Sequence, residues 1–406
     1  MNRHLLFSPS STYPMPVAYL VDHTGRVVHT WSSGEEQPDA ADRPPGYLRG
    51  WNHVELGPDG CLYALVPLHA LLRLGPDGHL VWKRELPVHH DLDIDAQGRV
   101  HVLTERPRTV VNDHGDRPRV ILDNTVAVLD TEGRPVEEYS LYDLLTADPE
   151  LRPLVHDLHE RRWGAFADSG WTPSSAWEAD LVERAEYRGP TRDALRYLRD
   201  LPGSPADVLH ANTVELLGDH PGGLWRAGDV LLSFRDLDLV VVANPAARRV
   251  RWWWGPGTLS GQHQPSALAG GTVLLLDNGR SRGRSRVLEY DPVIEEVVWR
   301  YTADPPEDFF TEVAGGCEIS GTDRVLVTDA QAGRAFEVDR SGRVLWEMRV
   351  HPPATGARRS RASVYRISLP PEEGVRAVLD QVRPEVRDID HPTIAHARAY
   401  SSTAER

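Results

Sequence analysis

The strongest constraint on the fold is an internal repeat of four short strands divided by turns. The clearest copy spans residues 50–86, where the runs VEL, LYALV, ALLRL and HLVWKREL are separated by GPDG or similar turns. Short apolar or alternating runs punctuated by Gly, Pro and Asp are typical of an antiparallel meander. The repeat therefore predicts an all-β chain built of four-stranded sheets.

Four further copies of this unit follow, beginning at VHHDLDI, LHANTVELL, GQHQPSAL and GGCEIS. Residues 18–31 have the pattern of the last two strands of another unit, and residues 363–380 the pattern of two further strands. Joining the chain ends would complete a sixth unit and remove exposed sheet edges. We therefore predict one domain over residues 1–406, a six-bladed β-propeller closed by N- and C-terminal strands that share one blade.

Residues 141–205 interrupt this rhythm. Within them, LYDLLTADPELRPLVHDLHERRW and SAWEADLVERAEYRGPTRDALRYLRDL have apolar residues at helical spacing, with Pro or Gly at the borders. The segment is predicted to be a helical insertion between blades 2 and 3. It could pack on one face of the propeller or cover its channel, and the sequence leaves both roles open.

Four of the five complete units carry a histidine at the start of the first strand. Aligned by that strand, the units give His53, His90, His210, His263 and, in the last, Cys317. The first strand of a propeller blade lines the central channel, so we predict that the four imidazoles face one cavity. Four histidines at one repeat position favour a functional role. The cysteine is interpreted as a small core residue.

Several motifs together resemble the arylsulfate sulfotransferase (arylsulfotransferase) family, whose members are six-bladed β-propellers. They are YLVDHTGRVVHTW, the pair HANTVELL and LLSFRD, and QHQPSALAGGTVLLLDNGRSR. The resemblance implies transfer of a sulfuryl group from a phenolic sulfate ester to a phenol through a sulfohistidine, without a nucleotide sulfate donor. It also implies small aromatic molecules as donor and acceptor, and no cofactor.

The resemblance implies a catalytic role for four residues of this sequence. By position within the motifs, His263 matches the nucleophile, and His210, Arg235 and His90 match its supporting residues. A neutral imidazole can attack sulfur, and a second histidine can protonate the leaving phenolate and later deprotonate the acceptor. An arginine presents a permanently charged planar set of donors to sulfuryl oxygens.

Other residues are candidate substrate contacts. His89 would replace His90 if the strand register differed by one residue. Asn212 is predicted to point to the same side as His210, where it could hold sulfuryl oxygens or anchor the backbone. Asn278, before a glycine, is expected to form a turn or to orient a neighbour. For the arginines that follow it, a solvated face is favoured over sulfate docking: Arg280, Arg282, Arg284 and Arg286.

His53 has no part in this mechanism, and we place it among the substrate contacts. It also opens an alternative, because four channel histidines could bind a metal and support an oxygenase, lyase or isomerase. Arg235 argues against a metal, since a guanidinium beside a dication would be repelled. A third possibility is a non-catalytic ligand-binding propeller. We predict an enzyme with no metal.

Charge and composition narrow the partners. The net charge of -15 disfavours binding to nucleic acid and to anionic membranes. Lys83 is the single lysine, which argues against Schiff-base chemistry, and Cys61 and Cys317 form no metal-binding spacing. The N-terminus lacks the apolar stretch of a secretion signal, and no segment approaches the length of a membrane span. We expect a cytoplasmic protein that serves a biosynthetic step in secondary metabolism.

Overall fold

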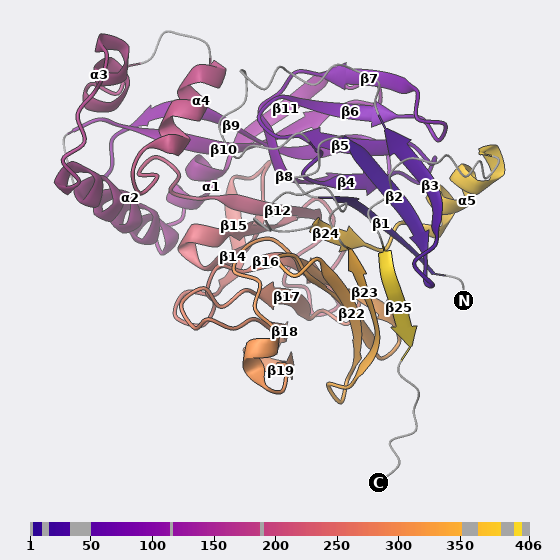
Figure 1. The fold of residues 1–406 in the computed structure, drawn as a ribbon. Coiled ribbons are helices and arrows are strands. Elements are labelled where there is room, and N and C mark those ends of the chain that lie inside the picture. Colours follow the sequence, from indigo (N-terminus) through magenta and orange to yellow (C-terminus); the bar gives the residue numbers. More distant parts are fainter. Residues whose placement is uncertain are drawn as a thin grey trace. The chain divides into compact units, whose positions relative to one another are not determined.

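A computed structural model of the chain describes residues 3–9, 16–32, 50–113, 117–186, 191–350, 364–382 and 394–399. The strands form six antiparallel sheets, five of four strands and one of five (Figure 1). These sheets are the blades of a six-bladed β-propeller, which confirms the predicted fold. The chain divides into two compact units, residues 1–85 with 259–406 and residues 86–258.

The first unit holds four of the six sheets. One is β24 (Val364–Ser368), β1 (His4–Pro9), β2 (Val17–Asp22) and β3 (Val27–Ser32). The next is β4 (Val54–Leu56), β5 (Leu62–Val66), β6 (Ala70–Leu74) and β7 (Leu80–Arg84). A third is β16 (His263–Ala267), β17 (Val273–Asp277), β18 (Arg286–Asp291) and β19 (Glu296–Tyr301). The last is β20 (Gly316–Gly321), β21 (Arg324–Asp329), β22 (Arg334–Asp339), β23 (Val344–Val350) and β25 (Ile394–Ala399).

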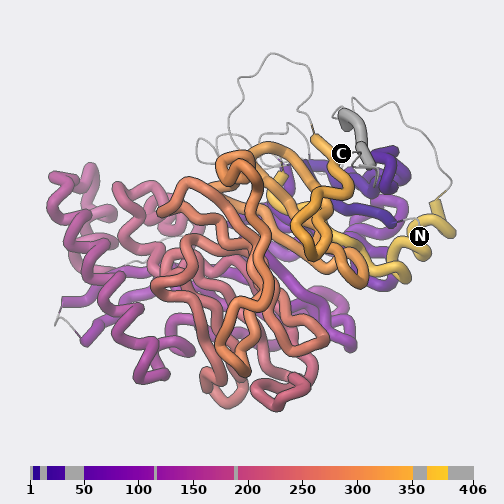
Figure 2. Tube along the Cα trace, turned by 90° about the horizontal axis from the view of Figure 1, so that it is seen from below, coloured from indigo at the N-terminus to yellow at the C-terminus, as the bar shows by residue number. Residues whose placement is uncertain are grey.

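One sheet combines three N-terminal strands with β24 from the C-terminal part of the chain. β24 pairs antiparallel with β1, so yellow and indigo segments lie side by side in Figure 2. The sheet takes three N-terminal strands and one C-terminal strand, and the expected two-and-two division was wrong. The second expected C-terminal strand is the helix α5 (Glu372–Gln381). Two glutamates in its first turn favour the helix N-terminus, and the buried Val375 and Val378 are three residues apart, as one helix face requires.

The second unit holds the other two sheets. One is β8 (Val88–Ile94), β9 (Val100–Val110), β10 (Arg119–Leu129) and β11 (Pro135–Ser140). The other is β12 (Ala211–Leu216), β13 (Val230–Phe234), β14 (Leu239–Asn244) and β15 (Arg249–Trp254). The three consecutive tryptophans, residues 252–254, thus lie at the end of the last strand of their sheet.

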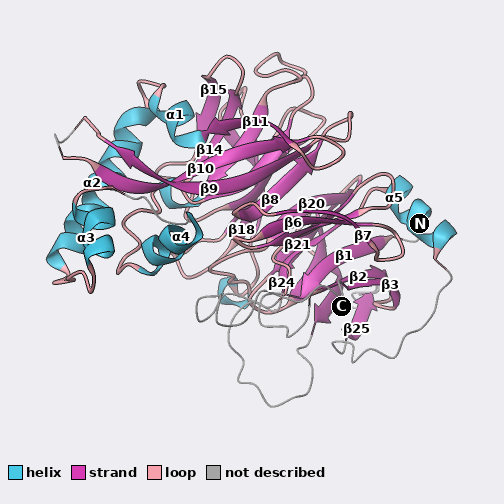
Figure 3. Ribbon diagram, turned by 90° about the horizontal axis from the view of Figure 1, so that it is seen from above, coloured by secondary structure: helices cyan, strands magenta, loops and turns pink. Residues whose placement is uncertain are grey.

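Between β11 and β12 the described residues form four helices, within the segment predicted to be helical (Figure 3). They are α1 (Leu141–Thr146), α2 (Leu151–Asp168), α3 (Ala176–Glu183) and α4 (Thr191–Asp200). Ser140 and Ser175 cap α1 and α3 by accepting a backbone N–H. No helix of the described residues is long and apolar enough to cross a membrane.

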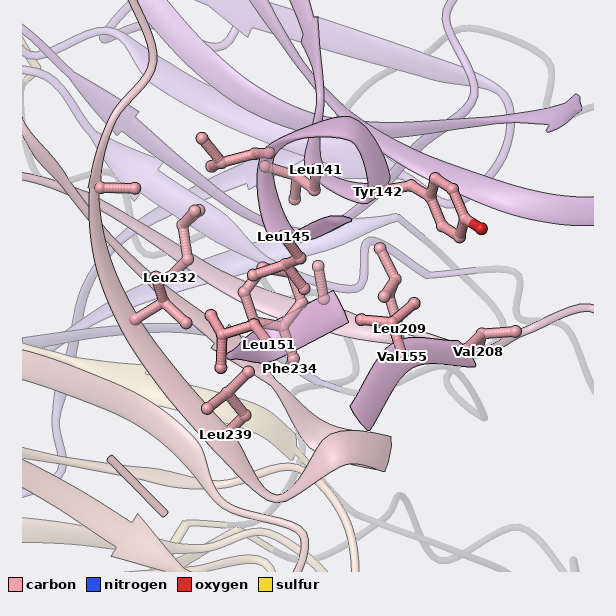
Figure 4. Packing of buried hydrophobic residues seen from close by; sticks show 14 of the residues in the cluster. Leu141, Tyr142, Leu145, Leu151, Val155, Val208, Leu209, Leu232, Phe234 and Leu239 are labelled. Atoms are coloured by element: carbon pink, nitrogen blue, oxygen red, sulfur yellow. The ribbon is translucent and has the colours of Figure 1, made fainter. Parts of the chain in front are cut away.

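The insertion shares the apolar core of the second unit. Leu141 and Leu145 of α1 pack in one cluster with Leu232 and Phe234 of β13 (Figure 4). A second cluster joins the apolar faces of α2, α3 and α4 to Leu122 of β10. These contacts bury the apolar face of every insertion helix, so the insertion is part of the unit's folded core.

The first strands of three blades contain a backbone irregularity that the alternation of apolar and polar residues does not predict. The pairing register shifts within β8, β12 and β16. Left-handed φ values occur at or beside the same places, 56° at His90, 48° at His210 and 45° at Gln264. A β-bulge redirects side chains, and left-handed backbone is costly for residues other than glycine. Strained backbone therefore accompanies three of the predicted histidine positions.

Candidate functional site

In the first unit, His263 is buried in one defined tautomer. Its Nδ1 lies 3.0 Å from the carbonyl oxygen of Gly261 and 2.8 Å from Oδ1 of Asn278. Both partners accept only, so Nδ1 carries the proton. On the other side of the ring, the Ala314 N–H donates to Nε2 over 3.3 Å. The imidazole is neutral, with its lone pair on Nε2, which is the form a nucleophile requires.

The tautomer of His263 depends on how Asn278 is held. The Asn278 Nδ2 donates to the carbonyl oxygens of Thr311, at 2.7 Å, and of Ala314, at 2.9 Å. Those two bonds fix the amide orientation and leave Oδ1 facing the imidazole. Of the two roles expected for Asn278, the structure shows the orienting one. Asn278 is fully buried and contacts the histidine rather than lining an open face.

The residues around Asn278 explain the polar sequence DNGRSRGR. Asp277 is fully buried and accepts hydrogen bonds from Arg282, at 2.6 Å, and Arg286, at 2.8 Å. The expected solvated face was therefore wrong for these two arginines, because they neutralise a buried carboxylate. Gly279 has φ 71°, and a Cβ there would lie 1.8 Å from the Arg284 carbonyl oxygen. The turn therefore requires glycine.

A second polar cluster of the first unit surrounds His53. This histidine is buried, and its Nε2 lies 3.5 Å from Oε2 of Glu55. Burial raises the pKa of Glu55 to about 7, and the Arg366 guanidinium opposes that rise. Burial also raises the pKa of Glu318 to about 7, against the lowering by hydrogen bonds from the Leu369 N–H and Gln264. His53 is thus placed beside acidic groups.

In the second unit, His89 and His90 form a chain of hydrogen bonds. His89 Nε2 donates to the Thr104 carbonyl oxygen over 3.1 Å, so its Nδ1 is an acceptor. His90 Nδ1 donates to that nitrogen over 2.9 Å, which leaves the lone pair of His90 on Nε2. Burial lowers the pKa of His89 to about 4 and that of His90 well below its ordinary value. His89 is thus hydrogen-bonded to His90, and which of the two contacts a substrate stays a prediction.

His210 lies beside His90 and is held by a carboxylate. The two rings are 4.8 Å apart between centroids, in an edge arrangement. His210 Nδ1 lies 2.5 Å from Oδ2 of Asp207, a buried residue that the sequence reasoning missed. Burial by itself raises the pKa of Asp207, but His210 and then Arg199 and Arg235 outweigh it and hold the pKa below its usual range. Carboxylate and imidazole form an oriented pair.

Arg235 joins the same group through the backbone. It follows β13 directly, and its N–H donates to the His210 carbonyl oxygen over 3.2 Å. The guanidinium Nε donates to Asp236 over 2.7 Å. The motif pair HANTVELL and LLSFRD is thus a pair of neighbouring strands, and it brings histidine and arginine together.

Two arginines of the insertion reach this group. Arg162 of α2 donates to Asp236 over 2.6 Å. Arg199 of α4 makes two hydrogen bonds, of 2.8 and 2.6 Å, to the buried Glu105 of β9. The insertion therefore adds positive charge near His210, a contribution that no spacing in the sequence indicated. Asp207, by contrast, could have been proposed from the sequence as a partner of His210, because it stands three residues before that histidine.

Asn212 has a less direct link to His210 than the sequence suggested. It is fully buried on β12, where Thr213 Oγ1 donates to its Oδ1 over 3.4 Å. The register shift between Ala211 and Thr213 breaks the simple alternation on which its predicted direction depended.

One group of described residues has metal-ligand spacing: Asp207, His210 and Asp236, with ligand atoms within 4.8 Å of one another. The arrangement does not fit a cation well. Asp236 already accepts from Arg162 and Arg235, and Asp207 from His210. A dication would have to displace these donors beside two guanidiniums.

The predicted residues thus form two groups. His263 and Asn278 lie in the first unit, and His89, His90, His210 and Arg235 lie together in the second. The meeting of all four histidines at one cavity stays a prediction. A cavity of about 620 Å³ in the first unit is lined by Arg3, Arg324 and Trp346 among others, and by none of the predicted site residues. Cys317 is buried in an apolar cluster, as expected.

A comparison with protein families bears on these two groups. Residues 185–351 match the arylsulfotransferase (ASST) family. The predicted family resemblance is thereby confirmed. The matched segment contains His210, Arg235, His263 and Asn278, and it ends before β24 and β25. Small aryl compounds are the substrate class that this family implies.

Curated proteins yield no match to the chain. Among solved structures, a protein of unknown function from Bacteroides caccae has 10% identity and a TM-score of 0.49, covering 90% of this chain and 98% of its own. AztD from Citrobacter koseri has 8% identity and a TM-score of 0.40, covering 90% and 96%. BamB from Moraxella catarrhalis has 11% identity and a TM-score of 0.35, covering 82% of each chain. Likenesses at this level indicate no function.

Proposed function

We propose that this protein transfers a sulfuryl group from a phenolic sulfate ester to a phenol, with a sulfohistidine at His263 and no nucleotide sulfate donor. The observation that carries the proposal is the state of His263. Its Nδ1–H is held by Asn278 and Gly261, and its lone pair is on Nε2. The residue stands in the segment that matches the arylsulfotransferase family.

In the first half-reaction, Nε2 of His263 attacks the sulfur atom of the donor. The new N–S bond forms as the bond between sulfur and the phenolic oxygen breaks, and the electron pair leaves with that oxygen. The leaving phenolate takes up a proton, a general-acid role that the family resemblance gives to His210, whose Nδ1 is paired with Asp207. The sulfohistidine keeps its Nδ1–H, whose partial positive charge Asn278 Oδ1 stabilises.

In the second half-reaction, an acceptor phenol takes the place of the first product. His210, now neutral, removes the phenolic proton, and the phenolate oxygen attacks sulfur. The N–S bond breaks, its electron pair returns to Nε2, and the sulfate ester leaves. Both histidines are then in their starting states, so no external acid, base or metal is consumed.

Two further groups would stabilise the charge on the sulfuryl oxygens. Arg235 supplies a fixed cation beside His210. The Ala314 N–H, which points at Nε2 of His263, would be released to a sulfuryl oxygen once sulfur bonds to that nitrogen. Backbone N–H groups commonly serve such a role in acyl transfer.

The first test follows phenolate release from a chromogenic aryl sulfate by chelator-treated protein, with and without a phenol acceptor. We expect His263→Ala to lower the rate by about 10³-fold or more, since the nucleophile is lost. Rapid quenching and peptide mass spectrometry should find sulfate on the His263 peptide. His220→Ala is a matched control, because this buried histidine caps a separate turn.

Release that continues in His263→Ala would contradict the proposed nucleophile. No release from a broad panel of aryl sulfates by the wild type would contradict sulfuryl transfer itself. In that case the non-catalytic alternative is tested by equilibrium binding of the same esters.

A further inference from the structure

Gln264, the residue after His263, has a backbone conformation that is unfavourable for a residue other than glycine and for one that precedes proline. Its φ is 45°, in the left-handed region. It also precedes Pro265, and a residue before proline is restricted to extended conformations. Strain of this kind persists only where the surrounding structure holds it. The register shift in β16 between His263 and Ser266 is the local result.

A side-chain contact between two blades of the first unit holds this conformation. Gln264 Nε2 on β16 donates to Glu318 Oε1 on β20 over 2.8 Å. The other carboxylate oxygen, Oε2, accepts the Leu369 N–H, just after β24, over 2.9 Å. Glu318 is therefore fixed by donors from two other strands, and it anchors the Gln264 amide. Gln264 itself is 9% exposed, so water competes little for the bond.

Gly316 provides the space for this contact. A Cβ added at Gly316 would lie 1.6 Å from Gln264 Oε1 and 2.7 Å from its Cδ. The backbone of Gly316 is not in the left-handed region, so the need for glycine here is spatial. Any larger residue would displace the Gln264 amide.

We infer that Gln264 and Glu318 are positioning residues that hold the bulge and thereby aim the imidazole of His263. This inference rests on the proposed function for its catalytic consequence. Gln264 shares a peptide bond with His263, so a change of φ at Gln264 rotates that peptide and the ring with it. Asn278 sets which nitrogen carries the proton, and the Gln264–Glu318 contact sets where Nε2 points.

The sharpest test is Gly316→Ala, which displaces the amide without changing either bonded residue. We expect kcat to fall by about tenfold with KM little changed, because misplacing a reacting atom costs rate rather than binding. A partner exchange tests the contact itself. Glu318→Gln and Gln264→Glu should each lower kcat, and the double variant should recover to within about threefold of wild type.

The recovery has a structural reason. In the double variant the new carboxylate at 264 accepts from the new amide at 318, whose oxygen still accepts from the Leu369 N–H. Net charge is unchanged. Glu55→Gln is the control, since the Glu55 carboxyl lies in the same polar cluster and contacts His53; it should change kcat by less than about twofold.

A readout without activity separates this inference from the proposed function. We would measure the rate at which diethyl pyrocarbonate modifies His263, by peptide mass spectrometry, in folded wild type and Gly316→Ala. A changed rate supports the positioning role even if no aryl sulfate is turned over. Unchanged modification and unchanged kcat in Gly316→Ala, or a double variant no better than the worse single one, would overturn it.

Discussion

The two units hold their key histidines with different chemistry. In the first unit, His263 Nδ1 faces a neutral amide and a backbone carbonyl. In the second, His210 Nδ1 faces the buried carboxylate of Asp207. An amide fixes the tautomer without favouring the charged ring, whereas a carboxylate also stabilises the imidazolium. The difference matches a nucleophile that must stay neutral and an acid–base residue that must gain and lose a proton.

Among the variants that test this difference between the two histidines, removing the carboxylate partner of His210 should have the largest effect. Asp207→Asn should lower kcat by about 10²- to 10³-fold, because the amide can hold His210 in the wrong tautomer and no longer stabilises its charged form. The steady-state rate and its pH profile are the measurements. Asp236→Asn, which removes a neighbouring carboxylate that accepts hydrogen bonds from Arg162 and Arg235, should cost less. Equal losses would show that charge alone matters.

Giving His263 a carboxylate partner should make the two histidines alike. Asn278→Asp is expected to raise the pKa of His263 by about one unit or more, as an adjacent opposite charge does. The acidic limb of kcat/KM should move to higher pH, with about a tenfold loss at neutral pH. Circular dichroism must accompany this test, since the variant also removes the donors to Thr311 and Ala314. An unmoved limb would contradict the role of the amide.

Acidification should affect strands β4 and β20 of the first unit and strand β8 of the second unit in opposite directions. In the folded state the pKa of Glu55 and of Glu318 is about 7, above the ordinary 4.5, so their contribution to stability is full at low pH and is lost as pH rises through about 7. The pKa of His89 is about 4, below the ordinary 6.5, so its contribution is present at high pH and is lost as pH falls from 6.5 towards 4.

Hydrogen–deuterium exchange between pH 7.5 and 5.5 measures this contrast once intrinsic exchange is corrected. Peptides of β4 and β20 should become better protected, and those of β8 less protected, each by less than about tenfold per pH unit. Parallel changes in all three strands would contradict the assigned environments.

The smallest expected effect is that of metal removal. The Asp207, His210 and Asp236 group has suitable spacing, but its oxygens already accept from arginine and histidine. Dialysis against a chelator should change the rate of phenolate release by less than about twofold, and added Zn²⁺ or Mn²⁺ should not raise it. Metal-dependent turnover would instead support the alternative of a metal enzyme.

Local patterns in the sequence were sufficient to predict the blades and to select candidate site residues. The recurring GPDG-like turns and alternating apolar runs predicted nearly every strand, because side-chain alternation and turn chemistry depend on only a few neighbouring residues. The same repeat alignment selected His90, His210 and His263 as candidates. Asp207 was not selected, although it stands only three residues before His210. Strand β1 was not predicted, because its short apolar run near the start of the chain is not followed directly by the other strands of a recognisable repeat.

Contacts between distant residues were decided only by the tertiary structure. The Asn278 amide orientation depends on two carbonyls more than thirty residues away, and the tautomer of His263 follows from it. Arg162 and Arg199 reach the second unit's site from helices whose sequence shows only amphipathic spacing. The left-handed Gln264 needs Glu318, 54 positions later. Sequence periodicity indicates which face of a strand or helix a side chain lies on. A hydrogen bond also depends on where the partner residue lies, and for residues far apart in the sequence only the folded structure determines that position.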